Sequence, residues 1–266
     1  MELNNTASML SDASKYNALA ITQSHHISSE NIEITGGSNG VYCKTDVVYN
    51  DKSTWGSTGY VMRKMVFKNL WIHDVAGEGK YDGHTSPQGQ TVKGANGQDT
   101  VIATIPLDSV EVIDCIVERC GWDGIQISHS ISGNIIRNNL IKDVGLKMVS
   151  QQVNGAIMGG RCEGVIEGNT IINAPGSGIA VFGWGNVVVK NNVLTNTGTI
   201  TANEPAVYIR KNYPEGAKLK TDMLNNTITG GRFAGIQNAS TSGYAVPGQW
   251  KDNIITNIES GKKLLS

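Results

Sequence analysis

The chain has 266 residues and a formal net charge of −1, so its overall charge does not indicate a nucleic-acid-binding protein. Its hydrophobic content of 39% is too high for a disordered chain, and no stretch approaches the roughly 20 consecutive apolar residues of a membrane helix. We therefore expect one folded domain with no nucleic-acid partner and no membrane insertion. The four cysteines show no CxxC spacing, which argues against a zinc site, and no disulfide framework is implied at this length.

The segment 1–19 sets a few apolar residues among many polar ones, which predicts a short N-terminal cap. From residue 20 to 266 the chain repeats one short pattern, with two insertions at 47–64 and 87–108. Long loops on a rigid scaffold often carry function, so both insertions are of functional interest.

One half of the repeat is a small residue followed by a strand in which apolar residues alternate with others. Six segments fit this half: 40–43, 124–127, 155–158, 178–181, 206–209 and 235–238. Period-two alternation places every second side chain on one side of a sheet, so these strands should stack roughly 4.8 Å apart. The predicted core ladder contains Ile125, Ile127, Ala156, Met158, Ile179, Val181, Val207 and Ile209.

The other half is a short apolar strand that follows an asparagine. An asparagine repeated in each coil can hydrogen-bond to the asparagines above and below it, and it tolerates a tight turn. The predicted column contains Asn69, Cys115, Asn139, Asn169, Asn192, Asn226 and Asn253. Apolar residues do not recur at helical spacing over any long window after residue 20, which excludes a helical protein.

The end of the chain, residues 258–266, shows no evident cap over the last coil. An open end of a solenoid is an unpaired sheet edge. The sequence therefore predicts either a packing partner or a missing segment at the C-terminal coil.

These repeats, with the tract 121–128, resemble the secreted right-handed β-helix proteins related to pectate lyases and to alginate or chondroitin lyases. The resemblance covers nearly the whole chain from about residue 20 and implies an all-β fold, a single-stranded right-handed parallel β-helix of the pectin-lyase type with about seven or eight coils. It implies a secreted or cell-surface protein, although this chain begins without the charged-then-apolar pattern of a signal peptide. The same fold hosts lyases, hydrolases, epimerases and non-catalytic proteins, and no complete catalytic signature of these enzymes is found.

Outward side chains of the strands that follow each small residue form one lateral wall. Aromatic rings can pack on pyranose faces, while cations and amides can bind carboxylates and hydroxyls, so the wall suits a polysaccharide. The predicted substrate-binding residues are Tyr42, Lys44, Gln126, Phe182, Trp184, Tyr208 and Arg210. The alternative is that long loops cover Phe182 and Trp184 and that Arg210 pairs with Glu204.

Asp82 precedes Gly83, and Asp123 precedes Gly124. We treat these two glycines as the same position of the repeat in different coils. If their coils are adjacent, the two carboxylates lie about one strand spacing apart and must bind a cation or share a proton. Calcium takes oxygen ligands and can neutralise a uronate, so Asp82 and Asp123 form a predicted calcium site. The alternative is that both are ordinary turn residues, because Asp-Gly is a common turn dipeptide.

The predicted catalytic residues are His84, Asp123, His129 and Arg161. A histidine can act as a base near neutral pH and an arginine can stabilise an enolate, which favours β-elimination on an anionic polysaccharide. A glycoside hydrolase or an epimerase is less favoured, and two carboxylates one strand spacing apart are rather close for an inverting hydrolase. The sequence leaves open a non-catalytic carbohydrate-binding or cell-surface β-helix module.

Overall fold

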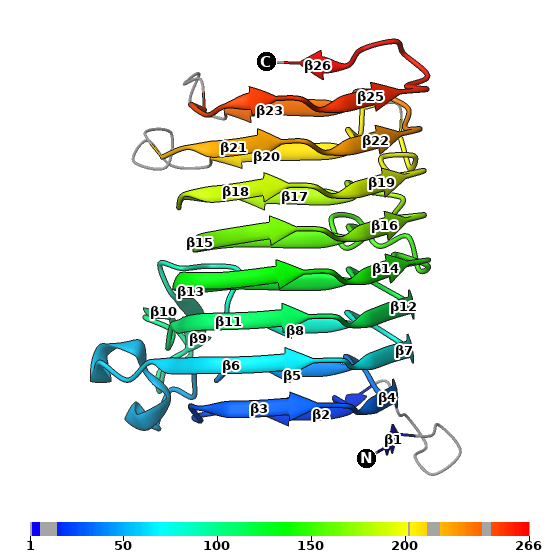
Figure 1. The fold of residues 1–266 in the computed structure, drawn as a ribbon. Coiled ribbons are helices and arrows are strands. Elements are labelled where there is room, and N and C mark those ends of the chain that lie inside the picture. Colours follow the sequence, from blue (N-terminus) through cyan, green and yellow to red (C-terminus); the bar gives the residue numbers. More distant parts are fainter. Residues whose placement is uncertain (1, 6–14, 202, 212–218, 241–245, 266) are drawn as a thin grey trace.

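The computed structural model describes residues 2–5, 15–201, 203–211, 219–240 and 246–265. Short parallel strands stack along one axis and form long sheets, so the chain is a parallel β-helix, as predicted (Figure 1). Among the described residues, no helix has the length and apolar character needed to cross a membrane.

The first sheet has nine strands, all paired in parallel with their neighbours in the stack. In order these are β1 (Glu2–Asn5), β4 (Glu33–Gly36), β7 (Trp71–Val75), β12 (Ile116–Cys120), β14 (Leu140–Lys142), β16 (Thr170–Ile172), β19 (Val193–Thr195), β22 (Thr227–Thr229) and β25 (Ile254–Thr256).

A further 15 strands form a continuous sheet with two parts, which we call the second and third sheets. The long strands β13 (Ile125–Arg137) and β15 (Ala156–Glu167) join them, because their beginnings lie in the second sheet and their ends in the third. The second sheet also contains β2 (Leu19–Ile21), β5 (Val41–Cys43), β8 (Lys80–Asp82), β17 (Ile179–Phe182), β20 (Val207–Lys211), β23 (Ile236–Ser240) and β26 (Leu264–Leu265). The third sheet also contains β3 (Ile27–Glu30), β6 (Met62–Lys68), β11 (Leu107–Ile113), β18 (Val187–Lys190), β21 (Thr221–Leu224) and β24 (Trp250–Lys251).

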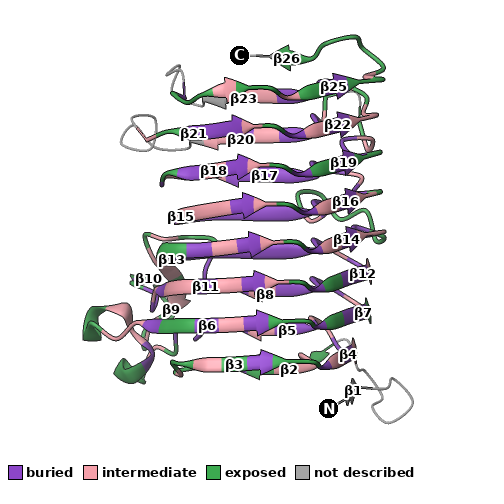
Figure 2. Ribbon diagram, in the orientation of Figure 1, coloured by how far each residue is buried: buried purple, intermediate pink, exposed green. Residues whose placement is uncertain are grey.

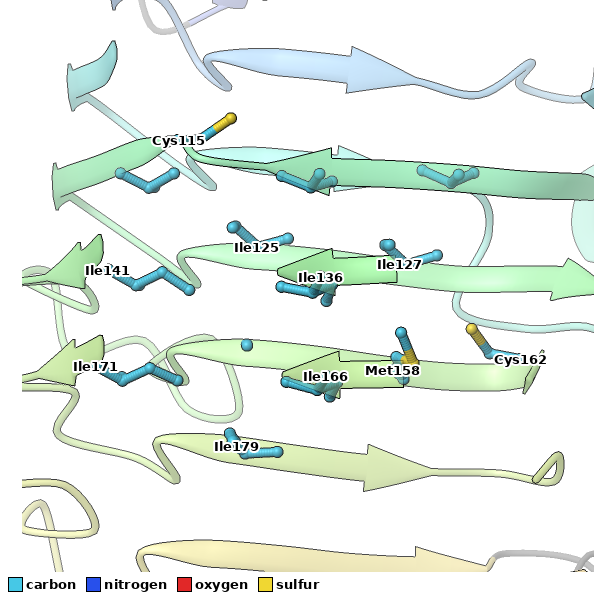
Figure 3. Close-up of a cluster of buried hydrophobic side chains, with 14 of the residues drawn as sticks. Cys115, Ile125, Ile127, Ile136, Ile141, Met158, Cys162, Ile166, Ile171 and Ile179 are labelled. Atoms are coloured by element: carbon cyan, nitrogen blue, oxygen red, sulfur yellow. The ribbon is translucent and has the colours of Figure 1, made fainter. Parts of the chain in front are cut away.

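The predicted core ladder is confirmed. Its eight side chains are at most 1% exposed, and they belong to one continuous cluster of buried residues inside the coils (Figures 2 and 3). Figure 3 shows Ile125 and Ile127 of the second sheet, Ile136 of the third and Ile141 of the first directed into this interior. The four cysteines are free and buried, so they pack as small apolar residues.

The asparagine column is confirmed from Asn139 onward but is wrong by one residue at Asn69. Each amide donates to the next Oδ1 at 2.9 Å, in the order Asn139, Asn169, Asn192, Asn226 and Asn253. Cys115 also lies in this column, where its backbone N–H donates to Asn139 Oδ1 at 2.9 Å. Because Trp71 pairs with Ile116, the column position belongs to Leu70, and Asn69 lies one residue earlier with φ of 51°.

The bend between the second and third sheets requires a left-handed backbone. His129 (φ 46°), Gly160 (φ 61°) and Gly183 (φ 80°) occupy it in successive coils. Glycine adopts this conformation without steric cost, and histidine is one of the other residues found there more often than most. His129 therefore stands at a structural position that the two following coils fill with glycine.

The two insertions fold against each other beside the second sheet. The first, 47–64, contains the 3₁₀ helices η3 (Lys52–Thr54) and η4 (Gly56–Thr58), and the second contains the antiparallel hairpin β9 (Gln90–Lys93) and β10 (Asp99–Ile102). The Gly56 N–H donates to the Ala103 carbonyl at 2.7 Å. Of the predicted cap, residues 2–5 form β1, and residues 6–14 lie outside the described residues.

Candidate functional site

A cleft of about 590 Å³ opens on the outer face of the second sheet. Its floor is formed by β13, β15, β17 and β20, whose parallel register aligns their outward side chains in two rows. Gly159 and Ala180 are small members of these rows, which leaves room beside larger neighbours. The lining residues from this floor are Gln126, Ser128, Ile157, Gly159, Gly160, Phe182, Tyr208 and Arg210.

The walls of the cleft come from connecting segments. On one side lie parts of the segment 148–154, which follows β14, and of the segment 200–204, which follows β19. Thr85 and Pro87, at the start of the second insertion, also line the cleft. Gln126 is fixed in the floor because its Nε2 donates to Thr85 Oγ1 at 3.2 Å and to Ser128 Oγ at 3.1 Å.

Four of the predicted substrate-binding residues therefore meet in the cleft: Gln126, Phe182, Tyr208 and Arg210. The Phe182 and Tyr208 rings pack edge to face, with centroids 5.8 Å apart. Arg210 Nε is buried and has no hydrogen-bond partner among the described residues. A buried donor without a partner is costly.

Glu204 also lines the cleft, but its Oε1 accepts from Ser177 Oγ at 3.3 Å. Burial raises the pKa of the Glu204 carboxyl, and the hydrogen bonds from Ser177 oppose that shift. The cleft thus combines an aromatic pair, an arginine and amides with one carboxyl that burial biases toward its protonated form. This mixture can recognise a sugar chain and a negative group on it.

Tyr42 and Lys44 lie on the same sheet face but outside the cleft, on β5 and just after it. The Tyr42 hydroxyl donates to Asp46 Oδ2 at 2.5 Å, and Lys44 Nζ lies 3.9 Å from the centroid of the Tyr81 ring. Lys44 is only 7% exposed. The two residues therefore form a separate cluster with Tyr81 and Asp46.

Trp184 and Arg161 lie just beyond the bend, where they pair as an isolated parallel bridge. Arg161 is exposed and Trp184 is half-buried, and neither lines the cleft. The structure therefore separates Arg161 from the floor on which Arg210 lies.

The histidines predicted to act as bases are both buried, and each makes a hydrogen bond within the protein. His84 Nε2 contacts the Thr45 carbonyl at 2.8 Å, and His129 Nδ1 contacts Thr104 Oγ1 at 2.8 Å. Burial lowers the pKa of His84, and it lowers the pKa of His129 to about 4, with the positive charges of His84 and Arg161 adding to the shift. Neither side chain lines the cleft.

The predicted stacking of Asp82 on Asp123 is wrong. Asp82 pairs in register with Ile127, so its side chain enters the core, where Oδ1 lies 2.6 Å from Lys80 Nζ. Lys80 Nζ in turn lies 3.1 Å from the centroid of the Phe67 ring. A calcium ion does not fit at Asp82, because an ammonium group already occupies the place of a cation there. Among the described residues, no group of three or more His, Cys, Asp or Glu side chains is placed to hold a metal ion.

The residue that holds the position of Asp123 in the adjacent coil is Glu78, not Asp82. The repeat pattern in the sequence did not identify Glu78. Lys80 pairs with Ile125, and the Gly79 N–H donates to the Asp123 carbonyl at 2.9 Å, so Gly79 is the equivalent of Gly124. Glu78 and Asp123 then hold the same position in adjacent coils. The segment Gly77-Glu78-Gly79 could have indicated this, had Gly79 rather than Gly83 been aligned with Gly124.

Both of these carboxyls are buried, Glu78 at 3% and Asp123 at 0% exposure. Burial raises the pKa of Glu78 to about 8, with the charge of Asp123 adding to the shift and Lys44 opposing it. Burial also raises the pKa of Asp123 to about 7, against the hydrogen bonds from Asn154. Asp123 does not line the cleft, but its Oδ1 accepts from Nδ2 of the lining residue Asn154 at 3.0 Å.

Two solved structures match the chain, and the first of them has a similar fold. The A-module of mannuronan C-5 epimerase AlgE4 from Azotobacter vinelandii matches with a TM-score of 0.60 and 12% identity over 94% of this chain, which spans 61% of that module. The AlgE6 A-module from the same organism matches with a TM-score of 0.38 and 14% identity, over 90% of this chain and 64% of that module. No curated protein matches the sequence. The family described as the right-handed beta helix region matches residues 10–258, and the chain belongs to this family.

Proposed function

We propose that the cleft binds a stretch of an anionic polysaccharide, as a secreted or cell-surface carbohydrate-active protein would. The observation that carries the proposal is Arg210, which lines the cleft, pairs in register with Phe182, follows Tyr208 by two residues on β20, and has an Nε without a partner in the described part of the chain. A guanidinium binds carboxylates in a fixed fork geometry, and aromatic rings pack on sugar rings.

The shape of the floor also supports a chain-like ligand. Successive strands lie about 4.8 Å apart, which is close to the length of one sugar unit, so a polysaccharide along the helix axis would meet a new strand at each unit. The similar AlgE4 A-module is named for an epimerase of mannuronan, itself a polysaccharide. At 12% identity this likeness concerns the fold, so the substrate class rests on the cleft.

The test is direct binding to alginate, pectate and a glycosaminoglycan, with dextran as the uncharged comparison, at mildly acidic pH and low salt. Arg210→Gln should weaken binding to the anionic polymers about 10- to 100-fold, since a hydrogen bond to a charged group contributes roughly 1.5–3 kcal/mol. Phe182→Ala should weaken it several-fold. Arg232→Gln is the matched control, because Arg232 pairs with Glu259 and lies outside the cleft. Equal binding by the Arg210 and Arg232 variants would refute the proposal.

Calcium removal provides a separate test of the ligand chemistry. Because Asp82 points into the core, where it pairs with Lys80, and does not stack on Asp123, we expect binding to persist when calcium is replaced by a chelator. Binding that appears only with added calcium would assign the recognition of the uronate to an ion rather than to Arg210.

A second candidate is β-elimination in the same cleft, favoured by one observation. Tyr208 and Arg210 are two residues apart on β20 and both line the cleft, so a hydroxyl and a guanidinium can face one sugar unit. Tyr208, as its phenolate, would take the proton α to the uronate carboxylate while Arg210 stabilises the enolate. The glycosidic C–O bond at the β position would then break, and the departing oxygen would take a proton back from the Tyr208 hydroxyl, which leaves an unsaturated uronate and restores the phenolate.

A rise in the absorbance of unsaturated uronates, lost in Tyr208→Phe, would establish the lyase. A flat trace on every polymer that the protein binds would refute the lyase. Neither outcome depends on His84 or His129, because neither side chain lines the cleft.

A further inference from the structure

Glu78 and Asp123 form a buried pair at the turn that precedes the second sheet. Asp123 Oδ1 accepts from the Asn154 backbone N–H at 2.6 Å and from Asn154 Nδ2 at 3.0 Å. Gln152 stands between the two carboxyls. In the amide orientation that gives both of its ends suitable partners, its nitrogen donates to Glu78 Oε1 at 2.9 Å and to Asp123 Oδ2 at 3.2 Å.

One oxygen of the pair remains without a partner. Glu78 Oε2 is buried and accepts no hydrogen bond from the residues that the structure describes. A carboxylate oxygen in that situation is costly, whereas a protonated carboxyl carries less charge into the interior. The geometry therefore favours a proton on this pair over two negative charges in adjacent coils.

The other charged groups around the pair do not replace that proton. Lys44 lies near Glu78 and opposes the effect of burial, but its ammonium is 3.8 Å from Asp46 Oδ1 and also faces the Tyr81 ring. Asp82 adds negative charge near Glu78 and is itself paired with Lys80. The groups that hydrogen-bond to the Asp123 carboxyl, Asn154 and Gln152, are uncharged.

The pair is connected to the cleft through two residues. Gln152 and Asn154 both line the cleft, and each donates to a member of the pair. The wall segment 148–154 is thus held in place by acceptors that belong to Glu78 and Asp123. Asn154 Oδ1 also accepts from the Ser177 N–H at 3.1 Å, which ties the wall to the next coil.

We propose that Glu78 and Asp123 hold one proton between them and, through Gln152 and Asn154, position the wall of the cleft, so that ligand binding weakens when this proton is lost. The part that concerns the ligand rests on the proposed polysaccharide function. Glu78 acts here as a positioning residue, because it lies behind Gln152 and does not line the cleft.

The sign of the pH effect follows from the direction of the shifts. Both pKa values are raised in the folded protein, to about 8 for Glu78 and about 7 for Asp123. The folded state therefore binds more protons than the unfolded state between about pH 4 and 8, so stability is greatest below this range and falls as pH rises through it.

The experiment compares the wild type with Glu78→Gln and Asp123→Asn, which imitate the protonated carboxyls. Melting temperature and binding of alginate are measured from mildly acidic to mildly alkaline pH. In the wild type, the melting temperature and the affinity for alginate should both fall as pH rises. The apparent Kd should increase up to about tenfold for each pH unit above the upper pKa. Glu78→Gln should flatten both profiles. Glu259→Gln is the matched control, since this exposed carboxyl pairs with Arg232 and should leave both profiles unchanged.

The outcomes separate this proposal from the proposed function. If Glu78→Gln and Asp123→Asn both keep the wild-type pH profile of melting, no shared proton exists and the proposal fails. If the melting profile flattens while binding keeps its pH dependence, the link to the cleft is refuted. If no anionic polymer binds at any pH, the proposed function fails, and so does the link between the proton and ligand binding. The pH profile of melting still shows whether Glu78 and Asp123 hold the proton.

Discussion

Asn169 shows how much of the fold depends on one side chain. Its Oδ1 accepts from the N–H and from the amide of Asn139, both at 2.9 Å, and its Nδ2 donates to the Ile136 carbonyl and to Asn192 Oδ1. Asn169→Ala should lower the free energy of unfolding by about 2–4 kcal/mol, because buried polar groups in neighbouring coils lose their partners.

Chemical denaturation measures that change, with Asn196→Gly as the control, because Asn196 has a φ of 54° at which glycine adds no strain. Asn196 also bonds to an asparagine in the preceding coil, at 2.8 Å to Asn173 Oδ1, but this contact is exposed. The control should therefore stay within about 0.5 kcal/mol of the wild type. Equal losses in the two variants would mean that burial of the ladder contributes nothing.

Lys80 and Asp82 form an ion pair in which both side chains are fully buried. Lys80→Ile alone leaves the Asp82 carboxylate without its partner and should cost about 3–5 kcal/mol. The double variant Lys80→Ile with Asp82→Ile copies Ile125 and Ile127 of the adjacent coil, which fill the same register. It should be at least as stable as the wild type in denaturant titrations. A double variant that loses the sum of the two single losses would contradict this.

The turn that leads into the first sheet is an element with a strict backbone requirement. Asn191 occupies it with φ of 57°, and Asn138 and Gly168 occupy it in the two preceding coils. Asn191→Ala should cost about 1 kcal/mol because an alanine Cβ strains this conformation, whereas Asn191→Gly should be close to neutral. Thermal unfolding of the two variants is the measurement. If glycine costs as much as alanine, the asparagine side chain rather than the backbone stabilises the turn.

The strands were predictable from the sequence because the period-two pattern repeats at each coil. Ile125 and Ile127 identify the second sheet, and Asn139 to Asn253 identify the corner before the first. The error at Asn69 has a physical cause: an asparagine is also favoured at the left-handed position one residue earlier. In this coil Leu70 holds the column position and Asn69 holds the left-handed position before it. The sequence alone does not show which of the two positions an asparagine occupies.

The period-two pattern of the strands predicted the floor of the cleft but not its walls. Gln126, Phe182, Tyr208 and Arg210 were predicted to point outward, and they line one cleft. The wall segments 148–154 and 200–204 are connections whose course no periodicity specifies.

The error at Asp82 has a different cause. An Asp-Gly dipeptide is a common turn, so the sequence pattern favoured a turn at Asp82 and Gly83. The structure instead places Asp82 at the end of β8, at an inward position, with a lysine partner two residues earlier. Only the buried ion pair with Lys80 makes that position tolerable for a carboxylate, and such a pairing cannot be recognised before the register is known.

The whole molecule is a stack in which each coil pairs with the coils next to it. Stability in such a stack is approximately a sum of coil and nearest-neighbour contributions, so damage should remain local. The long strands β13 and β15 pair with each other along both the second and the third sheet, so we expect the region around them to resist opening most.

Hydrogen exchange can test this local behaviour with a cavity in one coil. Val189 is fully buried on β18, which pairs with β15 and β21. Val189→Ala should cost about 2 kcal/mol and should accelerate exchange in those three strands, while β3 and β6, several coils away, keep wild-type protection. Ile255→Ala on β25 is the comparison, and its effect should stay near β22 and β25. Acceleration spread evenly over all coils in both variants would show instead that the stack opens as one cooperative unit.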